Sequence, residues 1–302
     1  MASAPHITFI LNPVAGRGRA RSHLKTLQVL LKSYPVSHSL FITSQKGEAT
    51  ILAQQASRTS SIVVAVGGDG TVNEVATGLI GSNSALGVIS DGSGNDFART
   101  VNASHNIEEM LERFTSPSVK QFDVGKALLT HIHGTTETRY FFNSIGIGFD
   151  ATVAEKVRSI KWLKGIPLYL TALFSSLIGY PSYPVTMSLN GTQWRNNYFL
   201  VCAGIGKWEG GGFKLTPDAK PDDGKFQICC IYGQSIIKVL PILPSIMTGT
   251  HIGKKHVEMF DTASATIESE LPLPVHGDGE NFGTTILKAD ISIVPSALSV
   301  IA

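Results

Sequence analysis

The string GGDGTVNE, residues 67–74, places glycines and an aspartate between a β-branched run and a helix-like segment. Glycines at a strand-to-helix turn allow several backbone N–H groups to point at one anion, and the helix N-terminus attracts negative charge. Such a turn can hold a phosphate. A carboxylate would repel a bare phosphate, so Asp69 indicates a role through Mg²⁺ or a hydrogen-bond network. The alternative is a tight glycine turn with Asp69 as helix N-cap.

Two further loops have similar chemistry. SDGSGNDFAR, residues 90–99, has a Gly-Ser-Gly turn before Asn95 and Asp96, and NPVAGRGR, residues 12–19, supplies two arginines. If all three loops follow neighbouring parallel strands, they face one crevice at the carboxyl edge of the sheet. Together they are typical of a site for nucleotide phosphates. No G-x-x-x-x-G-K-[ST] string occurs, which excludes a P-loop.

The first third of the chain alternates strand-like and helix-like patterns, which predicts an α/β fold with a doubly wound parallel sheet. Strands are expected at 7–11, 39–43, 62–66 and 86–89, and helices at 19–31, 47–56 and 71–80.

From about residue 122, runs rich in Thr, Tyr, Phe and Val predict an antiparallel, β-rich, sandwich-like second domain. One helix is expected around 159–178, and SIGIGF, residues 144–149, is interpreted as a turn between strands. The predicted domains are residues 1–122 with a returning segment 285–302, and residues 123–284.

Composition excludes several protein classes. The 302 residues carry 25 Lys plus Arg against 23 Asp plus Glu, a net charge of +2 that is too small to favour nucleic acid as partner. The three cysteines form no C-x-x-C pair, so neither a disulfide scaffold nor a zinc site is expected. A reducing, cytoplasmic compartment fits best. His131, His133, His251 and His256 lack a third ligand at a useful spacing and are expected at the surface.

Six motifs occur in one order over nearly the whole chain. They are NPVAG (12–16), GGDGTVNE (67–74), GSGNDFAR (92–99), NSIGIGFDA (143–151), GGGFKLTPDAKPDDG (210–224) and HGDGE (276–280). In these motifs the chain resembles the diacylglycerol kinase catalytic-domain superfamily, and in length and motif order it is similar to the small bacterial lipid kinases.

The resemblance implies a nucleotide site in the first domain. The residues that match the ATP-binding positions are Asn12, Pro13, Val14, Ala15, Gly16, Thr43, Gly67, Gly68, Asp69, Gly70, Thr71, Val72, Asn73 and Ser93.

The resemblance also implies a metal, a base and a polar network. A structural Mg²⁺ would be bound by the carbonyls of Lys220 and Lys225 and by the Asp223 carboxylate, and Glu280 would accept the proton. Acids matching Asp69, Asp96 and Asp123 would form an interdomain network, and Asp69 and Asp96 are further catalytic candidates. One positioned carboxylate can accelerate such a reaction by ~10²- to 10⁴-fold. Without the resemblance, Glu280 would be interpreted as a solvated turn acid.

One residue departs from the family pattern. The family has Pro-x-Gly-Thr where this chain has Ser90-Asp91-Gly92-Ser93. Serine can still donate a hydroxyl hydrogen bond, but Asp91 adds a negative charge beside a phosphate site. Either Asp91 points away, or nucleotide affinity or preference has changed.

The substrate side is expected around the predicted helix. Leu163, Ile166, Leu170, Leu173 and Leu177, with Trp162 and Tyr169, would form an apolar face flanked by Lys156, Arg158, Lys161 and Lys164. This pattern fits an interfacial enzyme, and equally a core helix with solvated lysines at its start. Prolines divide the uncharged stretch into pieces too short to cross a bilayer.

The sequence therefore predicts an ATP- and Mg²⁺-dependent lipid kinase of phospholipid metabolism that acts on a diacylglycerol-like hydroxyl. It would be cytoplasmic, contact the membrane peripherally, bind no nucleic acid, and could form a homodimer. Two alternatives stay open: a nucleotide-binding regulatory protein without turnover, and a kinase of a soluble hydroxylated substrate.

Overall fold

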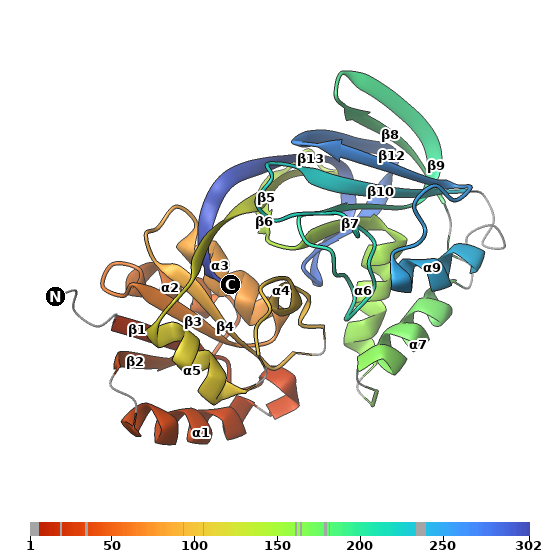
Figure 1. Ribbon diagram of the computed structural model, residues 1–302. Coiled ribbons are helices and arrows are strands. Elements are labelled where there is room, and N and C mark those ends of the chain that lie inside the picture. The colour runs from red at the N-terminus through yellow and green to blue at the C-terminus, as the bar shows by residue number, and fades with distance from the viewer. Residues whose placement is uncertain are drawn as a thin grey trace. The chain divides into compact units, whose positions relative to one another are not determined.

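The computed structural model describes residues 6–18, 20–33, 36–92, 94–104, 106–160, 162–163, 165–177, 180, 182–233 and 240–302. The chain divides into two compact units, which are described separately below (Figure 1). Unit 1 comprises Met1–Phe122 and Ser296–Ala302, and unit 2 comprises Asp123–Pro295. Ser93, Arg19, Lys161 and Lys164, which the sequence analysis singled out, lie outside the described residues.

Unit 1 is built on parallel strands in the order β4-β3-β1-β2, and the end of the last strand, β13, adds beside β4. The strands are β1 (His6–Leu11), β2 (Ser37–Ile42), β3 (Ile62–Gly67), β4 (Ala85–Ser90) and β13 (Glu280–Ile301). Every residue of β3 and β4 is buried. Continuous apolar runs are typical of parallel strands covered on both faces, and this is how they were recognised in the sequence.

Helices lie on both faces of this sheet (Figure 1). They are η1 (Ala15–Gly18), α1 (Ala20–Ser33), α2 (Glu48–Ala56), α3 (Asp69–Leu79), α4 (Asp96–Thr100) and α5 (Ile107–Thr115). α1 and α5 share one apolar cluster with the strands, in which the rings of Phe9 and Phe114 are 6.3 Å apart. α2 and α3 contact each other and the strands through buried alanines and valines.

Unit 2 is a β-rich domain, as predicted. Its strands are β5 (Val119–His131), which begins in unit 1, β6 (Thr136–Phe141), β7 (Ser144–Gly148), β8 (Tyr183–Leu189), β9 (Thr192–Gly204), β10 (Phe226–Tyr232), β11 (Val257–Thr262) and β12 (Ser264–Gly277), with most of β13. They follow the order β11-β10-β9-β7-β12-β13 with antiparallel pairs. β8 pairs with β9 and β12, and β5 pairs with β6 and β13.

The prediction of a turn at residues 144–149 was wrong, because SIGIG (144–148) forms the strand β7. β7 pairs with β9 on one side and β12 on the other. Its two glycines misled the sequence analysis. They are tolerated because side chains from neighbouring segments fill the space over Gly146.

The helix expected around 159–178 is α7 (Gly165–Leu177), and a further helix that was not predicted, α6 (Phe149–Ser159), precedes it. Further along the chain, the short helices η2 (Leu240–Ile242) and α9 (Leu243–Thr248) follow. Leu173 and Leu177 lie in an apolar cluster with strand residues, so this part of the expected cleft or membrane face is core. Trp162 and Phe174 are exposed. Among the described helices, none is both long and apolar enough to cross a bilayer.

Unit 2 contains a buried histidine and buried cysteines, and the position of this histidine differs from the prediction. His251 is fully buried and its Nε2 contacts the Leu215 carbonyl oxygen at 3.0 Å, so the prediction of a surface position was wrong. Cys202, Cys229 and Cys230 are free thiols in the core. Burial raises the pKa of all three thiols above the ordinary value. They therefore stay protonated and chemically inert.

Candidate functional site

The three predicted phosphate loops of unit 1 follow β1, β3 and β4 and are joined by hydrogen bonds. The Asn12 amide nitrogen donates to the Thr71 hydroxyl at 3.1 Å, which links the first loop to the second. The backbone N–H of Asp91 donates to the Gly67 carbonyl at 2.8 Å, which links the third loop to the second. Because parallel strands end at the same edge, these loops share one edge of the sheet.

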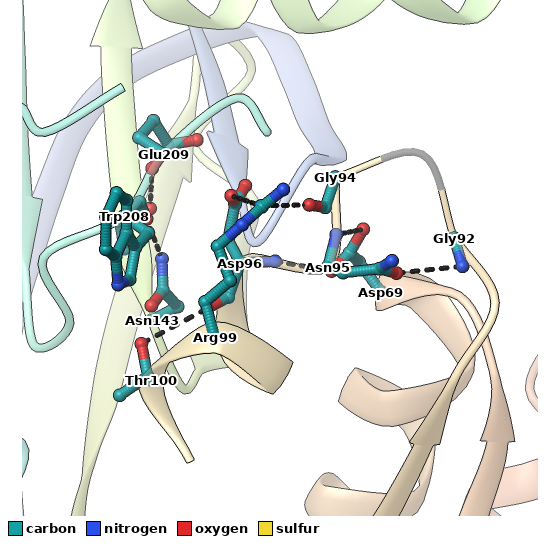
Figure 2. Close-up of polar contacts among 11 residues, drawn as sticks. Asp69, Gly92, Gly94, Asn95, Asp96, Arg99, Thr100, Asn143, Trp208 and Glu209 are labelled. Carbon is teal, nitrogen blue, oxygen red and sulfur yellow. Dashed lines mark hydrogen bonds and ion pairs between the residues drawn. The ribbon is translucent and has the colours of Figure 1, made fainter. Parts of the chain in front are cut away.

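Asp69 joins the second and third loops through both carboxylate oxygens (Figure 2). Its Oδ2 accepts from the Asn95 N–H at 3.0 Å and its Oδ1 from the Asp96 N–H at 3.2 Å. Burial raises the pKa of the Asp69 carboxyl, and the backbone donors act in the opposite direction. The N-cap of α3 is Gly68, not Asp69, so of the sequence alternatives the structure has the hydrogen-bond network.

The third loop is shaped by its own side chains. Asn95 adopts a left-handed conformation at the N-cap of α4, and its side-chain oxygen accepts from the Gly92 N–H at 2.8 Å. Arg99 pairs with Asp96 at 3.0 Å and also donates to the Gly94 carbonyl (Figure 2). Asp96 is therefore already engaged by a cation of its own helix.

Asp91, the departure from the family pattern, is buried against the first loop. Gly16 has a φ of +58°, and a Cβ there would lie 2.8 Å from the Asp91 Oδ2. Nδ1 of His23, in α1, lies 3.8 Å from the same oxygen. The Asp91 carboxylate thus packs between the first loop and α1, and only glycine fits at position 16.

Glu74, the last residue of GGDGTVNE, has a role that the sequence analysis missed. Its carboxylate accepts from the Gly47 N–H at 2.9 Å and from the Ala49 N–H at 3.3 Å, at the start of α2. The N-cap residue of α2 is Gly47, which has no side chain to cap the helix. An uncapped helix start is the sequence signal that could have predicted an acid from another segment here.

The predicted nucleotide-binding residues lie on these loops. Asn12, Pro13, Val14, Ala15 and Gly16 connect β1 to α1, Thr43 follows β2, and Gly67, Gly68, Asp69, Gly70, Thr71, Val72 and Asn73 run from the end of β3 into α3. No side chain caps the N-terminus of α3 among the described residues. This start of a helix, together with the glycine turns, fits the phosphates of a nucleotide.

In unit 2, Glu280 begins β13 directly after a two-residue hairpin turn. Asp278 and Gly279 both have positive φ, 49° and 75°, as a type I′ turn requires. The Asp278 carboxylate accepts from the backbone N–H groups of Phe142, Asn143 and Ser144 at 2.8–3.0 Å. Glu280 is half-buried and follows a turn that the Asp278 carboxylate attaches to residues 142–144.

The segment before β7 is fixed to the loop that follows β9. The Asn143 amide donates to the Trp208 carbonyl (Figure 2). The Ser144 hydroxyl donates to the Glu209 carboxylate. The Asn143 carbonyl accepts from the Ile205 and Gly206 N–H groups at 2.8 and 2.9 Å. The NSIGIG motif thus supports the Asp278 turn and the glycine-rich loop together.

The predicted Mg²⁺ residues lie on one turn before β10. The Asp223 carboxylate is exposed and accepts from the Lys225 N–H at 3.2 Å. Asp123 holds the turn, because its Oδ2 accepts from the Gly224 N–H at 2.7 Å and its own N–H donates to the Pro221 carbonyl at 2.7 Å. One carboxylate and two carbonyls, those of Lys220 and Lys225, form an all-oxygen donor set that fits Mg²⁺.

Replacing Asp69 with Asn should loosen the phosphate loops. An amide can accept only one of the two backbone N–H bonds and presents its NH₂ to the other donor. We expect the free energy of unfolding to fall by about 1–3 kcal/mol in urea denaturation. Glu112→Gln, on an exposed position of α5, should change it by less than about 0.5 kcal/mol. Equal stability of the two variants would contradict the proposed role of Asp69.

Replacing Asp278 with Asn should weaken the attachment of the Asp278–Gly279 turn, which precedes Glu280, to residues 142–144. Amide hydrogen exchange of residues 142–144 should accelerate by about tenfold or more, since a hydrogen bond to a charged acceptor contributes roughly 1.5–3 kcal/mol. The exposed Asp261→Asn is the control. Unchanged protection of these three amides would show that the carboxylate does not hold them.

Replacing Asp223 with Ala should remove the thermal stabilisation by Mg²⁺. A ligand at a hundred times its dissociation constant stabilises a protein by about 2.7 kcal/mol, so the melting temperature of the unaltered protein should rise on Mg²⁺ addition. Asp222→Ala, the exposed neighbour, should keep the response. A response that survives in Asp223→Ala would place the ion elsewhere.

Comparison with known proteins agrees with this arrangement. Residues 6–127 match the diacylglycerol kinase catalytic domain, and residues 143–302 match the YegS C-terminal NAD kinase beta sandwich-like domain. The diacylglycerol kinase of Mycobacterium tuberculosis is 28% identical over 305 residues, which cover 98% of this chain and 94% of that protein.

Solved structures show the same architecture. The crystal structure of a putative diacylglycerol kinase from Bacillus anthracis str. Sterne aligns with a TM-score of 0.80 at 25% identity and covers 100% of this chain and 96% of the other. The yeast NADH kinase aligns with a TM-score of 0.52 at 9% identity, over 99% of this chain and 83% of that one, which is a likeness of fold alone. From its two domains and their motifs, the chain belongs to the family of diacylglycerol kinase-like lipid kinases.

Proposed function

We propose that this protein transfers the γ-phosphoryl group of ATP to the hydroxyl of a diacylglycerol-like lipid, with Glu280 as the proton acceptor. The observation that carries the proposal is the Glu280 turn. Its Asp278 carboxylate binds three backbone N–H groups, which hold the neighbouring acid in one place. A general base is effective only when its geometry is fixed in this way.

The loops of unit 1 supply the nucleotide site. Backbone N–H groups at the start of α3 and in the glycine turns would bind phosphate oxygens, and the Ser93 hydroxyl would add a donor. Asp69 and Asp96 hold the loops that carry these donors. Asp91 packs against Gly16 and faces His23, so its carboxylate points into the protein. We therefore do not count Asp91 among the groups that would bind the nucleotide.

In the proposed reaction, the lipid oxygen forms a bond to the γ-phosphorus as its proton moves to Glu280. The bond between the γ-phosphorus and the bridging oxygen breaks, and ADP leaves. Mg²⁺ held by Asp223, Lys220 and Lys225 would supply structural stabilisation of the turn before β10. An acceptor carboxylate that stays ionised until the transition state avoids forming a free alkoxide.

Two exposed aromatic residues, Trp162 before α7 and Phe174 on α7, support peripheral contact with a membrane. The side chain of Trp162 is 77% exposed and that of Phe174 is 54% exposed. Lys156, on α6, is exposed as well. Exposed aromatic groups with basic neighbours are typical of surfaces that enter the headgroup region of a bilayer. A lipid substrate requires such contact, because its acyl chains remain in the membrane.

Replacing Glu280 with Gln should lower phosphate transfer by about 10²- to 10⁴-fold while nucleotide binding is kept. The assay follows label from ATP, with Mg²⁺, into a mixed lipid extract in detergent micelles. Glu270→Gln, an acid whose side chain is 89% exposed, should be fully active. Normal turnover in Glu280→Gln would remove this residue from the mechanism. ATP binding without label in any lipid would favour a regulatory protein or a soluble substrate.

Replacing Trp162 and Phe174 together with Ala should weaken sedimentation with anionic vesicles by about tenfold or more, because burial of one large apolar side chain contributes roughly 1.5–3 kcal/mol. Val29→Ala tests an equally exposed apolar residue in unit 1. Equal vesicle binding of all three proteins would exclude this surface as the membrane contact.

A further inference from the structure

Three ionisable side chains from separate segments of unit 2 converge beside β7. Asp150 lies in the first turn of α6, Glu209 in the loop between β9 and β10, and His276 on β12. The Asp150 Oδ2 is 3.0 Å from the His276 Nε2, which is 4.0 Å from the Glu209 Oε1. One donor atom from each residue lies within 4.8 Å of the others. None of these residues has a role in the proposed phosphate transfer.

Glu209 and His276 are buried and Asp150 is largely covered, so that charges on these side chains are costly. The side chain of His276 is 1% exposed, that of Glu209 10% and that of Asp150 13%. Two carboxylates in such a place carry more negative charge than one imidazolium can neutralise. Buried charges of this kind persist where they are paired or bind a metal ion.

The imidazole of His276 is buried without the hydrogen bonds that a core histidine normally makes. In the part of unit 2 that the structure describes, neither ring nitrogen has a hydrogen-bond partner, and the Asp150 Oδ2 accepts none. The Nε2 nevertheless faces that oxygen at 3.0 Å. A ring nitrogen that no hydrogen bond of the protein holds can bind a ligand that is shared with the carboxylates.

Gly146 provides the space in which these groups meet. It lies opposite His276 in the β7–β12 register. A Cβ at this position would collide with the Asp150 Oδ2 and the His276 Nε2. A side chain at position 146 would force the Asp150 and His276 donor atoms apart.

A hydrogen bond to its second oxygen also orients the Glu209 carboxylate. The Ser144 hydroxyl donates to its Oε2, while its Oε1 faces His276. Hydrogen bonds that fix a ligand carboxylate in this manner accompany metal sites and contribute to their affinity.

We propose that Asp150, Glu209 and His276 bind one divalent transition-metal cation. One imidazole nitrogen with two carboxylate oxygens suits Zn²⁺, Mn²⁺ or Co²⁺, whereas Mg²⁺ prefers oxygen alone. Bond lengths of about 2.0–2.2 Å place neighbouring donors roughly 3 Å apart. The Asp150–His276 pair already has this spacing, and Glu209 needs to approach by about 1 Å. The proposal is independent of the proposed kinase activity.

The ion would join the start of α6, the glycine-rich loop and the end of β12. His276 precedes Asp278 by two residues and Glu280 by four. The site therefore acts as a second anchor for the Asp278–Gly279 turn, in addition to the backbone N–H groups of residues 142–144 that hold Asp278. It is a structural site, separate from the all-oxygen turn at Asp223.

The test is a titration of the full chain with Co²⁺ after chelator treatment, in millimolar Mg²⁺ that fills oxygen-only sites. We expect one Co²⁺ per chain, visible d–d absorption, displacement by Zn²⁺, and no thiolate band. Absence of stoichiometric binding would overturn the proposal and leave the three residues as an internal ion-pair cluster.

Variants locate the ion. His276→Gln and Glu209→Gln should lose Co²⁺ binding by more than about 100-fold, and Ser144→Ala should weaken it by about 10- to 100-fold. His251→Gln, a buried histidine outside the cluster, and His131→Gln, which pairs with Glu137 at 3.3 Å, should bind normally. Melting curves in chelator verify folding, and if His276→Gln does not fold, Glu209→Gln and Ser144→Ala decide. Binding retained in the cluster variants would overturn the proposal.

Discussion

Carboxylates that accept hydrogen bonds from backbone N–H groups hold the functional loops of this protein. Asp69 does so for the third loop of unit 1, Glu74 for the start of α2, and Asp278 for the segment before β7. Asp123 does the same for the turn that carries Asp223. A loop at a strand end has N–H groups that no neighbouring strand can satisfy, and an ionised acceptor binds them more strongly than a neutral one.

This arrangement has a consequence for the chemistry. The acids that the family motifs contain are mostly committed to structure, and Asp69 in particular has both oxygens occupied by backbone donors. Glu280 differs from them in its position, because it follows the turn that Asp278 anchors. A carboxylate whose position is fixed by a neighbouring turn suits the role that we propose for Glu280.

Close backbone approach is the second constraint, and it explains why glycine recurs in the motifs. Gly16 allows the Asp91 carboxylate to lie against the first loop, and Gly146 allows Asp150 to reach His276. At both places a side chain would occupy the position of a carboxylate. The glycines of these motifs thus serve the acids of other motifs, not only the flexibility of their own turns.

The sequence by itself determined the strands of unit 1, the β-rich character of unit 2 and the family, because buried parallel strands and motif order are local or linear signals. It interpreted β7 as a turn, did not predict α6 and placed His251 at the surface, because the environments of these three depend on segments that are distant along the chain. The roles of Glu74 and Asp91 and the meeting of Asp150, Glu209 and His276 were decided only by the tertiary structure. Pairings between residues tens of positions apart leave no periodic pattern, since they arise from strand register and loop closure rather than from local propensity.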